Sequence, residues 1–470
     1  MKSEIERIVA DVKSGRTSAR AEVERVLAQA RERDELHCLL EVCAEQALAR
    51  ADRLDVRIKK GEPVGRLVGV PYVAKDNFLT KVGHTTAASK MLDNFRSPID
   101  ATAIERIEAE DAIMIGKANL DAFAHGGSTE NSAFGPTHNA IDKGRVAGGS
   151  SGGSAVAVAS GIVPFALGSD TGGSIRQPAS FNGVVGYKPT YGMISRYGVV
   201  AMASSTDTVG PITRTVRDSE IIADILAGQD QRDGTVYPRY FSQIAESPSG
   251  QRIGLIEDFI GEGVDDDVAS RTNQLAQRLR ESGHRVDLVK LPMARYALAI
   301  YYIVIPAELS SNMARYDGIR YGERSPEAHR LDDVYGMSRD DGLMPENKRR
   351  IMIGSYVLSS GYYDAYYLKA QQARTLLIRQ LDKLFESYDF LLSPVSPTPA
   401  FKLGENTHDP LKMYLADAMT VPASLAGLPA ISVPNGRSKA GLPIGVQLIA
   451  PAKADAGLLA MAKQLEADDA

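Results

Sequence analysis

Three short segments of the sequence carry residue types that could perform nucleophilic catalysis. The run PYVAKD contains Lys75, the run GGSSGGS contains Ser150, and the run GSDTGGSIRQP contains Ser174. A serine hydroxyl becomes an effective nucleophile only when a neighbouring base takes its proton. A lysine can act as that base when burial lowers its pKa and leaves it neutral. Because Lys75 follows an apolar run, we expect its side chain to enter the protein interior.

The spacing of these segments predicts a proton relay and an oxyanion hole. The small residues 171–173 precede Ser174 and allow consecutive backbone N–H groups to converge on one point, as a tetrahedral oxyanion requires. Ser150 lies 24 residues before Ser174 on another glycine turn and could pass a proton from Ser174 to Lys75. We therefore expect hydrogen bonds of about 2.6–3.2 Å from Lys75 Nζ to Ser150 Oγ and on to Ser174 Oγ.

Two other interpretations of the glycine-rich segments fit the sequence less well. Such loops often bind phosphate before a helix, but neither segment has the lysine of a GxxxxGK[ST] loop, and GxGxxG is absent. Residues 148–152 match GxSxG, the nucleophile elbow of α/β-hydrolases. That elbow needs a hydrophobic strand directly before it, and the preceding residues 142–147 do not form one.

The elements that must position these residues follow a β–α–β rhythm. The sequence predicts buried strands at 67–73 and 112–116 and a helix at 101–110. Thirteen of the 42 glycines fall between Gly144 and Gly198, which indicates tight turns and close backbone approach within an apolar core. We predict an α/β fold with a mixed β-sheet covered by helices on both faces.

We expect one large domain over residues 1–470. Its N-terminal part, 1–66, has helical patterning, and a mostly helical excursion is expected at about 220–390. Further strands are predicted at 253–256, 286–289, 390–392, 430–433 and 445–449, with helices at 155–160 and 268–282.

Composition excludes several classes of function. The 470 residues include 54 basic and 59 acidic side chains, a net charge of −5 that gives no sign of nucleic-acid binding by this chain. The two cysteines and seven histidines show no metal-ligand spacing, so we expect no catalytic metal. The longest apolar run, 296–307, is too short to cross a membrane and contains Pro306. We expect a cytoplasmic protein.

The two dense motifs, GGSSGGSAVAVASG and GSDTGGSIRQPA, together with the upstream lysine, resemble the amidase signature family. The resemblance implies a Ser–cis-Ser–Lys triad with Ser174 as the nucleophile and Lys75 as the base. Ser150 would be the bridging serine, with a non-proline cis peptide before it. The backbone amides of the oxyanion hole would come from Thr171, Gly172, Gly173 and Ser174.

Within that family, further segments resemble the amidase subunits of tRNA-dependent amidotransferases. They include NLDxFA at 119–124, STENSAFGPT at 128–137 and MYLAD at 413–417. Free glutamine is a zwitterion, so its pocket needs a cation for the α-carboxylate and an anion for the α-ammonium. The resemblance assigns these roles to Arg350 and Asp417. Ser128 and Tyr301 are expected to line the same pocket.

Two stretches depart from the pattern of those amidase subunits. The loop at 124–128 has the sequence AHGGS, where the pattern usually has Met at position 125 and Ser at 127. Residues 341–347 also differ from the usual run before KRRI. Neither stretch touches the predicted triad, but the loop could alter the shape of the pocket.

The resemblance implies a glutaminase that works with partners. Glutamine would be hydrolysed to glutamate and ammonia, and subunits B and C would use the ammonia to convert Glu-tRNA(Gln), with Asp-tRNA(Asn) as an optional second substrate. This chain itself would need no cofactor, and ATP and Mg would be bound by the partner subunit. The alternatives are a stand-alone amidase for a small carboxamide and a non-catalytic scaffold, against which the intact set of Lys75, Ser150 and Ser174 argues.

Overall fold

The computed structural model describes residues 3–243 and 249–467, and its centre is one mixed sheet of eleven strands. The strand order is β1-β3-β2-β4-β6-β5-β10-β11-β9-β7-β8. The pairs β2–β3, β2–β4, β7–β8 and β7–β9 are parallel, and the remaining pairs are antiparallel. The strands are β1 (Leu39–Val42), β2 (Pro71–Lys75), β3 (Ile113–Ala118), β4 (Phe165–Asp170), β5 (Val185–Lys188), β6 (Thr208–Thr213), β7 (Arg252–Ile256), β8 (Arg285–Val289), β9 (Phe390–Pro394), β10 (Ala430–Arg437) and β11 (Pro443–Ile449).

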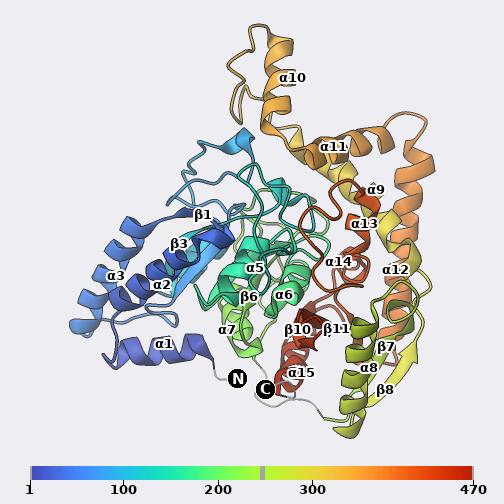
Figure 1. Cartoon of the computed structure of the whole chain (residues 1–470), viewed down its shortest axis with the longest axis horizontal. Helices are drawn as coiled ribbons and strands as arrows, with labels where there is room; N and C mark the ends of the chain where they lie inside the picture. The colour runs from blue at the N-terminus through green and yellow to red at the C-terminus, as the bar shows by residue number, and fades with distance from the viewer. Residues whose placement is uncertain (1–2, 244–248, 468–470) are drawn as a thin grey trace.

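Helices surround this sheet, and one of them, α10, projects from the body of the molecule (Figure 1). None of the helices in the described part of the chain combines the length and apolar character needed to span a bilayer. The helices are α1 (Glu4–Lys13), α2 (Ala19–Glu32), α3 (Ala44–Lys59), α4 (Thr102–Ala109), α5 (Gly152–Ala159), α6 (Arg176–Asn182), α7 (Val216–Leu226), α8 (Asp266–Glu281), α9 (Ala294–Met313), α10 (Leu331–Gly342), α11 (Pro345–Val357), α12 (Lys369–Phe385), α13 (Pro410–Leu415), α14 (Val421–Leu425) and α15 (Asp455–Ala467).

The central strands of the sheet are buried on both faces, as strand β2 illustrates. All five of its residues are buried. Tyr72 and Ala74 pack in one apolar cluster with Ile104 of α4, whereas Val73 packs in another with Val156 of α5. Because side chains alternate between the two faces of a strand, these clusters lie on opposite sides of the sheet. The predicted α/β fold with a mixed sheet and helices on both faces is confirmed.

The expected strand at 67–73 is placed too early. The chain turns at residues 67–70, where Gly69 has a φ of +75° and Val70 N–H donates to Leu67 O, and β2 begins at Pro71. The left-handed backbone of Gly69 explains the turn, because glycine adopts it without steric cost. Lys75 is therefore the last residue of the strand and does not follow it.

Other predicted elements agree with the structure within a few residues. The helix expected at 155–160 begins earlier, at Gly152 of α5. Within residues 3–66 the chain forms the helices α1, α2 and α3 and the strand β1, which pairs with β3. The excursion at 220–390 contains α9 to α12, and its strands β7 and β8 extend the same sheet.

The topology places the predicted catalytic residues at one edge of the sheet. Strands β2, β3 and β4 are parallel neighbours, so their carboxyl ends lie side by side. Lys75 ends β2, and the segment 171–174 follows β4. In open α/β sheets, ligands bind outside the carboxyl ends of parallel strands.

Candidate active site

The base and the bridging serine of the predicted triad are in contact. Lys75 is fully buried, and its Nζ donates hydrogen bonds to Ser150 Oγ at 2.8 Å and to Ser169 Oγ at 3.0 Å. It also contacts the carbonyl oxygen of Ser169 at 3.2 Å. The peptide bond between Gly149 and Ser150 is cis, as the family resemblance implied. Ser169, which sequence reasoning did not single out, helps to fix the ammonium group.

The predicted nucleophile lies in the turn between β4 and α6. Ser174 is 8% exposed, and its carbonyl oxygen accepts a hydrogen bond from Ser151 N–H at 3.1 Å. In the described part of the chain no hydrogen bond involves Ser174 Oγ, so the step from Ser150 to Ser174 stays a prediction.

Burial prepares Lys75 to act as a base. Removal from water lowers its pKa to about 7, although the carboxylates of Asp121, Asp170 and Asp207 oppose that shift. A buried ammonium is disfavoured because the interior solvates it poorly. Close to neutral pH a large fraction of the enzyme therefore holds Lys75 in the neutral form that can accept a proton.

We expect kcat/KM to rise with pH as Lys75 loses its proton. The protonated lysine cannot act as a base, so the rate should rise about tenfold per pH unit well below pH 7 and level off above it. The pH profile of kcat/KM on an uncharged amide checks this, because it reports groups of the free enzyme. A flat profile from mildly acidic to mildly alkaline pH, with chemistry rate-limiting, would contradict it.

The backbone after β4 has the features of an oxyanion hole. Among the described residues, none accepts a hydrogen bond from the N–H groups of Gly172, Gly173 or Ser174. A Cβ atom on Gly172 would lie 2.8 Å from Tyr301 Oη, and one on Gly173, whose φ is +144°, would lie 2.2 Å from Thr420 Oγ1. Only glycine fits at these two positions. The N–H groups of residues 172–174, which have no acceptor among the described residues, are available to bind developing negative charge.

The side chain of Thr171, the fourth residue predicted for the oxyanion hole, is held by a buried carboxylate. Its Oγ1 donates to Asp207 Oδ1 at 2.7 Å. The other oxygen of Asp207 accepts from the N–H groups of Met202 and Ala203 at 2.9 and 3.0 Å. Burial raises the pKa of Asp207 to about 6. Asp207 thus connects the segment after β4 to the loop before β6.

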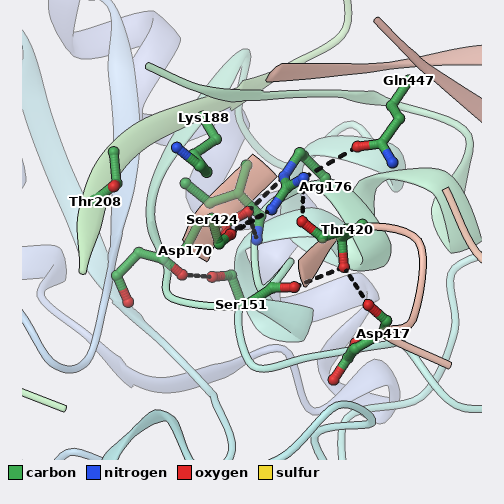
Figure 2. A network of polar contacts seen from close by, with 12 residues as sticks. Ser151, Asp170, Arg176, Lys188, Thr208, Asp417, Thr420, Ser424 and Gln447 are labelled. Atoms are coloured by element: carbon green, nitrogen blue, oxygen red, sulfur yellow. Dashed lines mark hydrogen bonds and ion pairs between the residues drawn. The ribbon is translucent and has the colours of Figure 1, made fainter. Parts of the chain in front are cut away.

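A buried ion pair fixes the other side of the same turn (Figure 2). Arg176 Nε and Nη2 donate to the two carboxylate oxygens of Asp170, each at 3.0 Å, and both residues are completely buried. Arg176 also donates to Thr420 O, Ser424 Oγ and Gln447 Oε1. The attraction of Arg176 outweighs the effect of burial and lowers the pKa of Asp170, so that Asp170 stays ionised.

Replacing Arg176 with methionine should lower the free energy of unfolding by about 3–5 kcal/mol, because Asp170 would remain buried without its cation. Chemical denaturation with urea measures the difference. The matched control is Arg20→Met, which breaks the exposed pair with Asp52 and should change stability far less, since water and salt screen such pairs. Equal effects of the two substitutions would contradict the structural role of Arg176.

Thr420 connects residues 171–174, the predicted oxyanion hole, to the predicted substrate residue Asp417 (Figure 2). Its Oγ1 lies 2.6 Å from Gly172 O and 3.0 Å from Asp417 O. A second link comes from Gln177, which accepts from Gly149 N–H at 2.9 Å and donates to Gly127 O at 2.8 Å. These contacts couple the nucleophile turn to the walls of the neighbouring cavity.

That cavity brings together three of the four predicted substrate residues. Ser128, Arg350 and Asp417 line a space of about 270 Å³. Tyr301 is not among its lining residues and instead lies against Gly172. The adjacent Tyr302, which sequence reasoning missed, lines the cavity.

The cavity holds the guanidinium of Arg350 and the carboxyl group of Asp417. Glu346 accepts from Arg350 Nε at 2.8 Å, and the guanidinium lies 5.1 Å from the ring of Tyr302. No described residue accepts from the two Nη groups of Arg350, so they remain for a ligand. Burial raises the pKa of Asp417 to about 8, against the attraction of Arg350. An added cation would restore the ionised form of Asp417.

In the described part of the chain, no three His, Cys, Asp or Glu side chains are grouped to hold a metal ion.

Comparison with known proteins identifies the family. The amidase family profile matches residues 21–459. The chain is a member of the amidase signature family. Its enzymes hydrolyse amide bonds, and this chain has the corresponding fold.

Two relatives of this amidase are A subunits of glutamyl-tRNA(Gln) amidotransferase. It is 49% identical over 436 residues to the A subunit of glutamyl-tRNA(Gln) amidotransferase from Koribacter versatilis, covering 92% of this chain and 91% of the relative. The crystal structure of the corresponding amidotransferase chain from Thermotoga maritima matches with a TM-score of 0.80 and 40% identity, covering 95% of this chain and 91% of that one.

Fold similarity alone does not distinguish substrates within this family. A bacterial aryl acylamidase matches with a TM-score of 0.84 but only 29% identity, covering 98% of this chain and 95% of that one. Sequence identity is higher to the amidotransferase subunits, at 49% and 40%, than to the acylamidase, at 29%. The TM-scores of 0.80 and 0.84 do not favour the amidotransferase subunit over the acylamidase. Substrate assignment for this amidase therefore depends on the residues of the cavity.

Proposed function

We propose that this amidase hydrolyses glutamine to glutamate and ammonia as the glutaminase component of a tRNA-dependent amidotransferase. The observation that carries the proposal is the cavity in which the guanidinium of Arg350 and the carboxyl group of Asp417 lie together with Ser128. Such a pair suits the α-carboxylate and α-ammonium of a free amino acid. The relatives at 49% and 40% identity, both named as chains of glutamyl-tRNA(Gln) amidotransferase, support the same function.

The proposed reaction begins with neutral Lys75. It takes a proton from Ser150, which takes one from Ser174, and Ser174 Oγ attacks the side-chain carbonyl carbon of glutamine. Backbone N–H groups at 171–174 stabilise the oxyanion. The C–N bond breaks, the relayed proton returns to the leaving nitrogen, and ammonia departs. Water then attacks the glutamyl ester by the same relay and releases glutamate.

We further propose that the ammonia serves partner subunits B and C. They would convert Glu-tRNA(Gln) to Gln-tRNA(Gln), with Asp-tRNA(Asn) as an optional second substrate, and the partner that activates the aminoacyl group would bind ATP and Mg²⁺. The charge of −5 agrees with a chain that leaves tRNA binding mainly to its partners. Such a complex would take part in protein biosynthesis in the cytoplasm.

The test is release of ammonia from glutamine by the full chain, alone and co-purified with its partner subunits. We expect a marked preference for glutamine over propionamide and butyramide. The Ser174→Ala variant provides the background rate. A preference for the simple amides in the presence of the partners would overturn the proposal in favour of a stand-alone amidase.

A further inference from the structure

The two stretches that depart from the family pattern meet beside the substrate cavity. His125 and Asn347 are 222 residues apart in sequence, yet His125 Nδ1 lies 2.6 Å from Asn347 Nδ2. Both side chains are fully buried. Neither takes part in the proposed reaction, so their contact requires a separate explanation.

The neighbouring contacts fix the direction of this hydrogen bond. Asn347 Oδ1 accepts from Met344 N–H at 3.0 Å, and Nδ2 also donates to Ala122 O at 2.8 Å. An amide nitrogen only donates, so His125 Nδ1 is the acceptor and the ring proton lies on Nε2. Burial, together with the positive charge of Arg350, lowers the pKa of His125 well below its usual range. The imidazole is therefore neutral near pH 7.

The hydrogen bond joins two walls of the cavity. His125 directly precedes the lining residues 126–128, which include Ser128. Its carbonyl oxygen accepts from Asn131 Nδ2 at 2.9 Å, so the loop is held at a second point. Asn347 lies in the first turn of α11, and Arg350 follows one turn later on the same side of that helix.

We propose that the His125–Asn347 hydrogen bond positions Arg350 against the loop that carries Ser128, and so sets the affinity for the amino-acid end of glutamine. His125 and Asn347 are positioning residues, which act through Arg350 without contacting the substrate. The inference rests on the proposed function, because it assigns the α-carboxylate to Arg350.

The chemistry of a buried hydrogen bond provides a specific test. Removing either partner breaks the same hydrogen bond and leaves a buried polar group unsatisfied, so the effects of the two substitutions on KM should not add. Asn347→Leu also removes the contacts of Asn347 with Met344 N–H and Ala122 O. Methionine is flexible enough to adapt to the space of the imidazole, and leucine has the shape of asparagine. His125→Met also removes the Nε2 donor, which has no partner among the described residues.

The experiment compares His125→Met, Asn347→Leu and the double variant in the full chain co-purified with its partners. Each single substitution should raise KM for glutamine about tenfold and change kcat less than about twofold. The double variant should raise KM no more than Asn347→Leu alone, because both substitutions remove the same hydrogen bond. Titration calorimetry of glutamine with the same variants in a Ser174→Ala background should show the same pattern in Kd. His329→Met, which changes an exposed histidine, is the matched control.

Additive or unchanged KM values across the three variants would overturn the inference. A lowered melting temperature with no change in KM would do the same, because it would show a structural role only. Failure of the unmodified complex to hydrolyse or bind glutamine, while simple amides are hydrolysed, would instead overturn the proposed function.

Discussion

Replacing Ser174 with alanine is expected to reduce glutamine hydrolysis by about 10⁵–10⁶-fold and to abolish the covalent glutamyl-enzyme. Nucleophile and base act as a unit in enzymes of this kind, so losing either removes most of the catalysis that both supply. Lys75→Ala should cost nearly as much, and the double variant little more than either single one. Initial rates of glutamate formation and intact-protein mass spectrometry after rapid quenching provide the two measurements.

The control for this prediction is Ser160→Ala, which removes a partly buried serine hydroxyl at the end of α5, away from the predicted triad. It should leave the rate within about twofold of the unmodified enzyme. Near-normal hydrolysis by the Ser174 or Lys75 variant would contradict the assignment. So would strictly multiplicative losses in the double variant.

Substitutions at the two charged ends of the cavity should change substrate choice more than reactivity. We expect Arg350→Ala and Asp417→Ala each to raise KM for glutamine by about 10²-fold or more, since the partner of each charge of the zwitterion would be lost. The Ser174 nucleophile should remain reactive towards an uncharged activated ester. Steady-state kinetics on both substrates measure the difference.

Lys348→Ala is the matched control, because this cation also belongs to α11 but pairs with Asp340 outside the cavity. It should change KM for glutamine less than about twofold. An equal loss on the ester and on glutamine in the Arg350 and Asp417 variants would show damage to the site as a whole and would contradict the binding role.

The sequence predicts the residues that act in the reaction better than it predicts the residues that hold them in place. Ser150 comes from a dense motif and Lys75 from a segment upstream of it, and spacing together with family resemblance predicts their hydrogen bond. Asp207 and Thr420 have no local signal, because each acts on the 171–174 segment from a distant part of the chain. Such partners become visible only when the sheet brings the strands together.

The substrate cavity shows the same limit. The resemblance singles out Arg350 and Asp417, which line one cavity, but it selects Tyr301 where Tyr302 is the lining residue. Adjacent residues on a helix point in directions about 100° apart, so a tyrosine-rich run does not reveal which ring faces a ligand. The contact of His125 with Asn347 is hidden for a related reason, since neither departure from the pattern indicates its partner.

Strand β2, which is buried on both faces and ends in Lys75, constrains the position of the catalytic base more strongly than the fold constrains the substrate cavity. The catalytic base is anchored in the sheet, where a shift of register would move every side chain of the strand to the opposite face. The cavity residues Arg350 and Asp417 instead belong to peripheral segments that do not pair with this strand. New substrate ranges can therefore arise by mutation of those segments while the hydrolytic apparatus is inherited unchanged.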